Sequence, residues 1–146
     1  MRTRTAALAA VAVGVIGTAA LGASAASTKT VTLGGAMSGG VETPKGDPTG
    51  KGTVTVTLNT ATGKVCWTFK IAKIDGKPSA AHIHKGGKGV AGAVVVPFGT
   101  AYKAKGCVVA PKATVAAIVK KPGGYYVNVH NGKHPAGAIR TQLSAM

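Results

Sequence analysis

Residues 53–71 read TVTVTLNTATGKVCWTFKI, and this stretch decides the fold class. From Thr53 to Leu58, polar and apolar residues alternate with a period of two, which is typical of a strand with one buried face. Residues 59–63 are turn formers. In the segment that follows them, the same period places four apolar side chains on one face: Val65, Trp67, Phe69 and Ile71. The stretch therefore predicts an antiparallel β-hairpin and a fold based on β-structure.

Further strand-like segments recur on both sides of this hairpin, at intervals of roughly 8–15 residues, which is the spacing found in β-sandwiches and barrels. The segment 93–96 is apolar on both faces, which predicts that it is buried on both sides. We expect an all-β fold: an immunoglobulin-like or superoxide-dismutase-like antiparallel β-sandwich or barrel with one short helix. The expected additional strands cover residues 30–33, 80–84, 93–96, 125–130 and 139–143.

Residues 111–120 interrupt the strand pattern. Val115, Ile118 and Val119 recur at helical spacing, and Pro111 stands where a helix would begin. The sequence predicts a helix of about two to three turns here, with another valine-rich strand as the alternative.

The composition excludes several classes of protein. The chain has 146 residues, 18 Lys and Arg, and three acidic residues, which gives a formal net charge of +15. Its length fits one domain and excludes a large multidomain enzyme, and the near absence of Glu excludes a coiled coil. Any pair of carboxylates must come from Glu42, Asp47 and Asp75, which lie in turn-like sequence, so acid-dependent catalysis is disfavoured.

The first 25 residues have the three parts of a secretory signal peptide in order. Arg2 and Arg4 precede the apolar run Ala6–Leu21, and Ala23–Ala25 forms a small-x-small cleavage site. The apolar run falls just short of a membrane span, so cleavage is favoured over a retained anchor. We expect a signal peptide at 1–25 and a single secreted domain over 26–146, with no transmembrane segment after cleavage and a net charge of +13.

The two cysteines, Cys66 and Cys107, both follow the predicted signal peptide. An even number of cysteines in an exported protein indicates a disulfide, because the compartments outside the cytoplasm are oxidising. We expect a Cys66–Cys107 disulfide, with two buried free thiols as the alternative.

The last two strand segments can be placed in register by their apolar faces. A loop at residues 131–135 puts Val127 opposite Ile139 and Tyr126 opposite Arg140. A two-residue turn would instead place Arg140 on the apolar face, so we favour the longer loop. The longer loop predicts a polar face that carries Tyr126, Asn128, His130, Arg140 and Gln142.

Three histidines are candidates for a site. Alternation puts His82 and His84 on one face of a strand, and His130 supplies a third imidazole if the two strands are neighbours. Three histidines with an open position suit zinc or copper. Acids to support metal-bound histidines are scarce, however, so we interpret these residues first as braces that hydrogen-bond the backbone, second as metal ligands, and third as contacts for a small ligand.

Long motifs at these positions resemble the CHRD (chordin-type) domain. The resemblance spans roughly residues 30–144, and it implies a secreted bacterial all-β domain without a settled biochemical activity. Two positions depart from the family pattern: Ala138 replaces an acid before the arginine, and Ala93 replaces a proline. A likeness to copper-zinc superoxide dismutase is weaker, because no bridging histidine or zinc-binding aspartate is found. The motifs that carry the CHRD resemblance are Ala81–His84, Gly86, Gly89, Gly92, Val94–Val96, Tyr126–His130, Pro135, Gly137, Ile139, Arg140, Gln142 and Leu143.

The basic residues do not form a nucleic-acid footprint. Fifteen lysines are scattered along the chain and Arg140 is the one arginine after the signal peptide, whereas nucleic-acid readers favour arginine forks and aromatic stacking. The glycine- and lysine-rich stretch 84–92 lacks the ending of a phosphate loop and predicts a flexible connection. Weak adhesion to anionic cell-envelope polymers or a lipid surface, or solubility alone, fits this pattern.

We therefore expect a non-catalytic extracytoplasmic module with a binding or structural role. The alternative is a copper- or zinc-binding protein, with possible redox activity, that uses the His-x-His strand.

Overall fold

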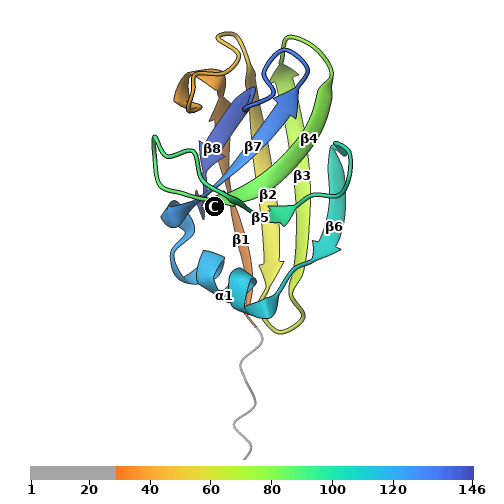
Figure 1. Ribbon diagram of the computed structural model, residues 1–146. Coiled ribbons are helices and arrows are strands. Elements are labelled where there is room, and N and C mark those ends of the chain that lie inside the picture. Colours follow the sequence, from red (N-terminus) through yellow and green to blue (C-terminus); the bar gives the residue numbers. More distant parts are fainter. Residues whose placement is uncertain (1–28) are drawn as a thin grey trace, which may run out of the picture.

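The computed structural model describes residues 29–146, so the predicted signal peptide lies outside the described residues. The described chain is mostly β-structure with one α-helix (Figure 1). The strands are β1 (Thr30–Ser38), β2 (Lys51–Asn59), β3 (Lys64–Lys73), β4 (Pro78–Lys85), β5 (Val94–Pro97), β6 (Lys105–Val109), β7 (Tyr125–Asn131), β8 (Ile139–Gln142) and β9 (Ser144–Ala145). The helix is α1 (Lys112–Lys120), and two 3₁₀ turns are η1 (Gly39–Val41) and η2 (Pro122–Gly124).

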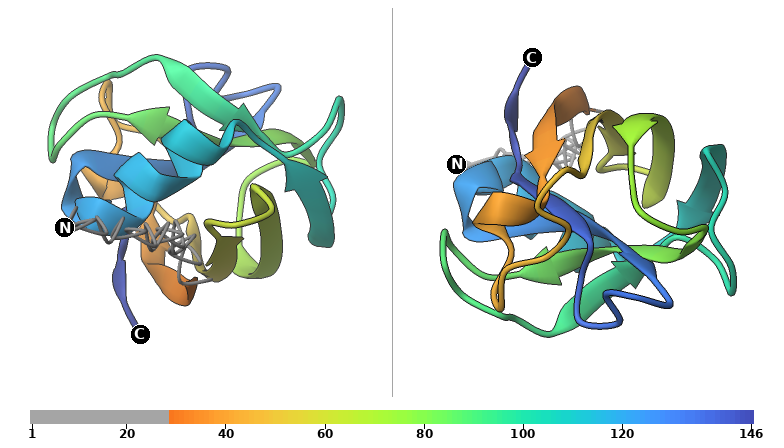
Figure 2. Two further views of the ribbon diagram at one scale, coloured as in Figure 1. Left: turned by 90° about the horizontal axis from the view of Figure 1, so that it is seen from below. Right: turned by 90° about the horizontal axis from the view of Figure 1, so that it is seen from above.

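The strands form one curled antiparallel sheet in the order β5-β4-β7-β8-β1-β2-β3-β6, with β9 paired to β1. The sheet folds over so that its two halves face each other, and α1 crosses one end of the space between them (Figure 2). The link between the halves is short, because β1 pairs with β8 through Ser38 and Arg140 alone. The prediction of an antiparallel all-β sandwich or barrel with one short helix is confirmed.

The β2–β3 hairpin forms where the alternating stretch predicts it. Leu58 pairs with Val65, and the turn is held by the Asn59 side chain, whose Oδ1 accepts from the backbone N–H groups of Ala61 and Thr62 at 3.0 and 2.9 Å. Gly63 closes the turn at a φ of 75°, a conformation that favours glycine. The inward face of both strands is buried, as alternation requires.

The core lies between the two halves of the sheet. Trp67 of β3 stacks on Phe98 with ring centroids 4.3 Å apart, and its indole N–H donates to the Lys103 carbonyl oxygen at 2.9 Å. The helix adds Val115 and Ile118, both fully buried. The predicted helix at 111–120 is therefore confirmed, and its apolar stripe closes one end of the core.

Four strands differ from expectation. β1 was expected at residues 30–33 but continues to Ser38, and the two-residue β9 was not predicted. β5 lies at the edge of the sheet, and Val94 is 46% exposed, so the prediction of burial on both sides is wrong. β6 occupies the opposite edge and was not predicted at all. Both edges are short strands, which is a common way to limit pairing with other chains.

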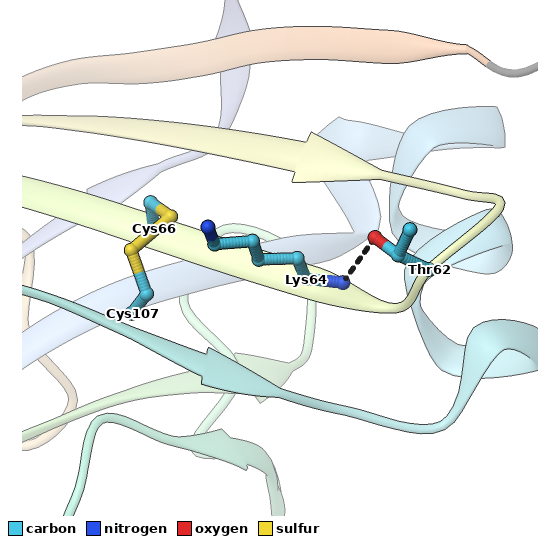
Figure 3. Close-up of a disulfide and its surroundings, with 4 residues drawn as sticks. All are labelled: Thr62, Lys64, Cys66 and Cys107. Atoms are coloured by element: carbon cyan, nitrogen blue, oxygen red, sulfur yellow. Dashed lines mark hydrogen bonds between the residues drawn. A yellow bond between two sulfur atoms is a disulfide. The ribbon is translucent and has the colours of Figure 1, made fainter.

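The Cys66–Cys107 disulfide is present and joins β3 to β6 (Figure 3). The two residues are direct partners in the antiparallel ladder, and both side chains lie on its partly exposed outer face. The disulfide therefore holds the edge strand β6 to its single neighbour.

Candidate metal centre

The three candidate histidines lie on one face of the β4–β7 pair. In the ladder, His82 is opposite Asn128, His84 is opposite Tyr126, and His130 is opposite Ala80. The alternate residues of both strands point into the core on the other face. The imidazoles come together because β4, which carries His82 and His84, pairs directly with β7, which carries His130.

The separations of the imidazole nitrogens suit a shared ion. His82 Nδ1 and His130 Nε2 are 3.2 Å apart, and one ring nitrogen from each histidine lies within 4.8 Å of the others. Two nitrogens bound to one tetrahedral zinc at about 2.0–2.1 Å stand roughly 3.3 Å apart. His82 and His130 already have this spacing, and the candidate nitrogen of His84 lies within 4.8 Å of theirs.

Backbone carbonyls orient two of the three rings. His84 Nδ1 donates to the Gly92 carbonyl oxygen at 2.8 Å, and His130 Nδ1 lies 2.9 Å from the Pro135 carbonyl oxygen. A carbonyl only accepts, so the proton of the neutral His84 ring is on Nδ1 and its lone pair is on Nε2. His130 has an oxygen acceptor beside both ring nitrogens, because its Nε2 also lies 3.0 Å from Asn128 Oδ1, so the contact with Pro135 alone does not fix its tautomer. Metal-bound histidines are commonly oriented in this way, by a carbonyl or a carboxylate behind the ring. The shortage of acids noted from the sequence therefore does not leave the histidines without support.

The Nε2 atom of His84 is the least satisfied polar atom of the cluster. His84 is 7% exposed, and its Nε2 has no hydrogen-bond partner among the described residues. A buried nitrogen without a partner carries a desolvation cost that a bound ion removes. The ring is held flat against Tyr126, with centroids 4.7 Å apart, so it cannot easily turn toward another acceptor or donor.

Burial and neighbouring charges favour the neutral form of His82 and His84. Burial lowers the pKa of His82 to about 4, and repulsion by His130 and His84 acts in the same direction. Burial also lowers the pKa of His84, and the charges of His130 and Arg140 act in the same direction, while the hydrogen bond to Gly92 and the nearby Asn128 side chain oppose the shift. Neutral imidazole is the form that binds a metal, so both rings are ready to act as ligands at neutral pH.

The register predicted for β7 and β8 from the sequence is wrong by two residues. Asn128 is opposite Arg140, and Tyr126 is opposite Gln142. The reversal extends past residue 135, because the Gly137 N–H donates to the His134 carbonyl at 3.1 Å before β8 begins. An offset of two preserves the face of every side chain, so the predicted polar face of Tyr126, Asn128, His130, Arg140 and Gln142 still forms.

The polar face secures the glycine-rich loop, residues 86–92. The Arg140 guanidinium is 1% exposed, lies 3.3 Å from the centroid of the Tyr126 ring, and donates to the Val90 and Gly87 carbonyl oxygens at 2.8 and 2.7 Å. Gln142 Nε2 donates to the carbonyl oxygen of residue 86 at 2.6 Å, and the N–H of residue 92 donates to the Tyr126 hydroxyl at 3.0 Å. The loop is therefore pinned along its length, in contrast to the flexible connection that its composition predicts.

Glu42 is a buried acid that the sequence did not point to. It follows η1, is 5% exposed, and its carboxylate packs against Gly137 close to Arg140. Its Oε1 has no hydrogen-bond partner among the described residues. Burial raises its pKa to about 7, although Arg140, the Thr43 N–H and the Asn128 side chain oppose the shift.

Glu42 thus brings a carboxyl group near Arg140 in a chain whose family-typical acid is replaced by Ala138. Its position in a glycine- and proline-rich loop gave no periodic signal that could have placed it there.

The other two acids support turns elsewhere. Asp47 accepts from the backbone N–H groups of Thr49 and Gly50, both at 2.9 Å, and from that of Asp75. Asp75 pairs with Lys133 at 2.7 Å on the surface. No acid among residues 29–146 is within the histidine cluster, which contains three imidazoles alone.

Comparison with known proteins agrees with this architecture. The model of the CHRD domain matches residues 33–143, so the chain belongs to the CHRD domain family. No curated protein and no solved structure matches the chain. Among the residues that the structure describes, no helix has the length and apolar character needed to cross a membrane.

Proposed function

We propose that this CHRD domain is an extracytoplasmic, non-catalytic module that binds a transition-metal ion, Cu(II) or Zn(II), through His82, His84 and His130. The observation that carries the proposal is the buried Nε2 of His84, which has no partner while its ring is fixed from behind by the Gly92 carbonyl. In a neutral ring whose Nδ1–H is held by this carbonyl, the lone pair on Nε2 is available to bind a metal ion.

The set of donors favours these two metals. Three neutral imidazoles without a thiolate or carboxylate suit copper and zinc, and poorly suit magnesium or calcium, which prefer oxygen. Among divalent ions the same nitrogen set binds copper more tightly than zinc. His82 and His130 are partly exposed, so a fourth position stays open to water or a small ligand.

Several features support a location outside the cytoplasm. The Cys66–Cys107 disulfide is typical of oxidising compartments. The signal-like sequence at residues 1–25 provides a route for export, after which residues 26–146 make up the functional domain.

Titration with Cu(II) and Zn(II) tests the proposal. The protein recovered from an exporting host, His82→Ala, His84→Ala and the matched control His134→Ala are titrated by calorimetry, and Cu(II) binding is followed by visible absorbance. We expect one site and no change in His134→Ala. The two cluster variants should lose at least about tenfold in affinity, because even the loss of a group that only orients a ligand typically costs about tenfold to a hundredfold. Because His82 is partly exposed, His82→Ala tests the site even if His84→Ala folds poorly. Equal weak binding by all four proteins would overturn the proposal.

A second role, adhesion to an anionic envelope polymer, is favoured by how the acids are used. Glu42 and Asp47 are buried and Asp75 is paired, so they leave nearly all of the lysine charge on the surface unneutralised. Retention of the protein on isolated cell envelope should fall as salt rises from about 50 mM. Absence of retention at that low salt would exclude an electrostatic role.

A further inference from the structure

A hollow of about 710 Å³ lies where the end of β4 meets the end of α1, apart from the histidine cluster. It is lined by Lys85, Ala117, Lys120, Lys121 and Tyr125, together with glycine backbone, and its surface is mostly apolar. Figure 1 shows α1 and the 3₁₀ turn after it at the end of the strands, beside the loop that leaves β4. Ligand pockets typically fall between about 300 and 1,000 Å³, so the size fits a small organic molecule.

The walls of the hollow are held together by hydrogen bonds between segments far apart in sequence. The Gly86 N–H donates to the Gly124 carbonyl oxygen at 2.8 Å, which ties the loop after β4 to η2. Gln142 Nε2 donates to the carbonyl oxygens of Gly86 and Gly123 at 2.6 and 2.9 Å, and so joins the same two segments from β8. The shape is therefore preformed, which lowers the entropy cost of binding a ligand.

Three lysines line this hollow, and its lining contains no acidic residue that could neutralise their charge. They come from different elements: Lys85 ends β4, Lys120 ends α1, and Lys121 connects α1 to η2. The three acids of the chain are all used elsewhere, as described above. Lysines at the end of a helix are favoured by its dipole, which accounts for Lys120 and Lys121. Lys85 lies at the end of a strand, where no helix dipole favours its charge.

We propose that this hollow binds a single-chain amphiphilic anion, a long-chain carboxylate, with its head group among the three lysines and its alkyl chain over Ala117 and Tyr125. The apolar surface removes the chain from water, and the ammonium groups of the three exposed lysines that line the hollow attract the carboxylate as point charges. Nucleotides fit less well, because the lining offers no arginine fork to hold a phosphate group. The proposal does not depend on metal binding by the histidines.

Dodecanoate, kept below the concentration at which it forms micelles, is the probe. Calorimetry measures its affinity, and amide NMR shifts locate it. Three proteins are compared with the unaltered one: Ala117→Phe, which fills the hollow without changing charge; the triple variant Lys85→Gln, Lys120→Gln, Lys121→Gln; and the matched triple variant Lys70→Gln, Lys73→Gln, Lys103→Gln. The control lysines are exposed and lie outside the hollow. Because Ala117 is also exposed, its replacement should leave the fold intact.

We expect dodecanoate to bind at one site, with amide shifts centred on residues 85–87, 117–121 and 124–125. Dodecanol, which has the same chain without the charge, should bind at least about tenfold more weakly than dodecanoate. Ala117→Phe and the first triple variant should each lose about tenfold in affinity, while the second triple variant should stay within about twofold. Binding that falls equally in both triple variants, binding that Ala117→Phe leaves unchanged, or no binding at all would each overturn the proposal.

Discussion

Replacing Glu42 by Gln should stabilise the protein at high pH and leave it nearly unchanged at low pH. Glutamine copies the shape of the protonated carboxyl group but never ionises. Glu42 is buried against Gly137 and close to Arg140, and its pKa is raised from 4.5 to about 7, chiefly by burial. The folded protein therefore holds the proton of Glu42 more tightly than the unfolded chain does.

The size of the effect comes from this difference in pKa. A rise from 4.5 to about 7 corresponds to about 3 kcal/mol between the protonated and ionised forms. The stabilising contribution is fully present below about pH 4.5 and is lost as the pH rises through 7. Partial hydration of the carboxyl lowers the amount expected, so the unaltered protein should lose about 2 kcal/mol relative to Glu42→Gln between pH 5 and 8.5.

Urea unfolding at several pH values measures the difference in free energy of unfolding between the two proteins. Taking the difference cancels the titration of the histidines, which is common to both. Asp75→Asn, which removes an exposed and paired carboxylate, controls for the loss of net charge and should change stability by less than about 1 kcal/mol. If the difference for Glu42→Gln is flat with pH, or if the unaltered protein gains as the pH rises, the attraction of Arg140 outweighs burial and the reasoning is wrong.

Three further changes have expected outcomes. Replacing Cys66 and Cys107 by Ser should cost about 4 kcal/mol of unfolding free energy in urea, because the disulfide spans 41 positions of the chain; a loss under about 1 kcal/mol would contradict this. Arg140→Lys keeps the charge but lacks the planar fork whose two nitrogens reach the Val90 and Gly87 carbonyls, so it should cost about 1.5–3 kcal/mol and speed amide exchange in residues 86–92; unchanged exchange would show that the loop does not depend on the guanidinium. Phe98→Ala removes the ring stacked on the protein's single tryptophan and should cost about 3–5 kcal/mol, with a changed tryptophan fluorescence in the folded state; a cost below about 1 kcal/mol would mean that the core refills the space.

Local alternation was sufficient to predict most strands. The β2–β3 hairpin combines a period of two with a turn that its own Asn59 side chain stabilises, so all the information lies within about 20 residues. The helix likewise carried its own signal in Val115 and Ile118. The same alternation placed His82 and His84 on one face correctly.

The parts that were missed depend on contacts between distant segments. Gly106 interrupts the pattern of β6 because a Cβ at this position would come within 2.7 Å of the Trp67 ring, and the sequence shows only a glycine. The predicted β7–β8 register was displaced by two residues because the turn between the strands continues to Gly137, whose φ of 139° favours glycine. Glu42 reaches Arg140 from a loop nearly 100 residues earlier in the sequence, and no local pattern reports such a contact.

The disulfide between β3 and β6 also affects how copies of the protein meet one another. β6 has five residues and is the only strand that covers that side of the ten-residue β3 in the described sheet. If β6 separated, β3 would present a long row of unpaired backbone groups, which is a template for pairing with another chain. By keeping β6 attached, the covalent bond protects the folded protein against edge-to-edge aggregation. A reduced population should therefore associate in a concentration-dependent way before it unfolds completely.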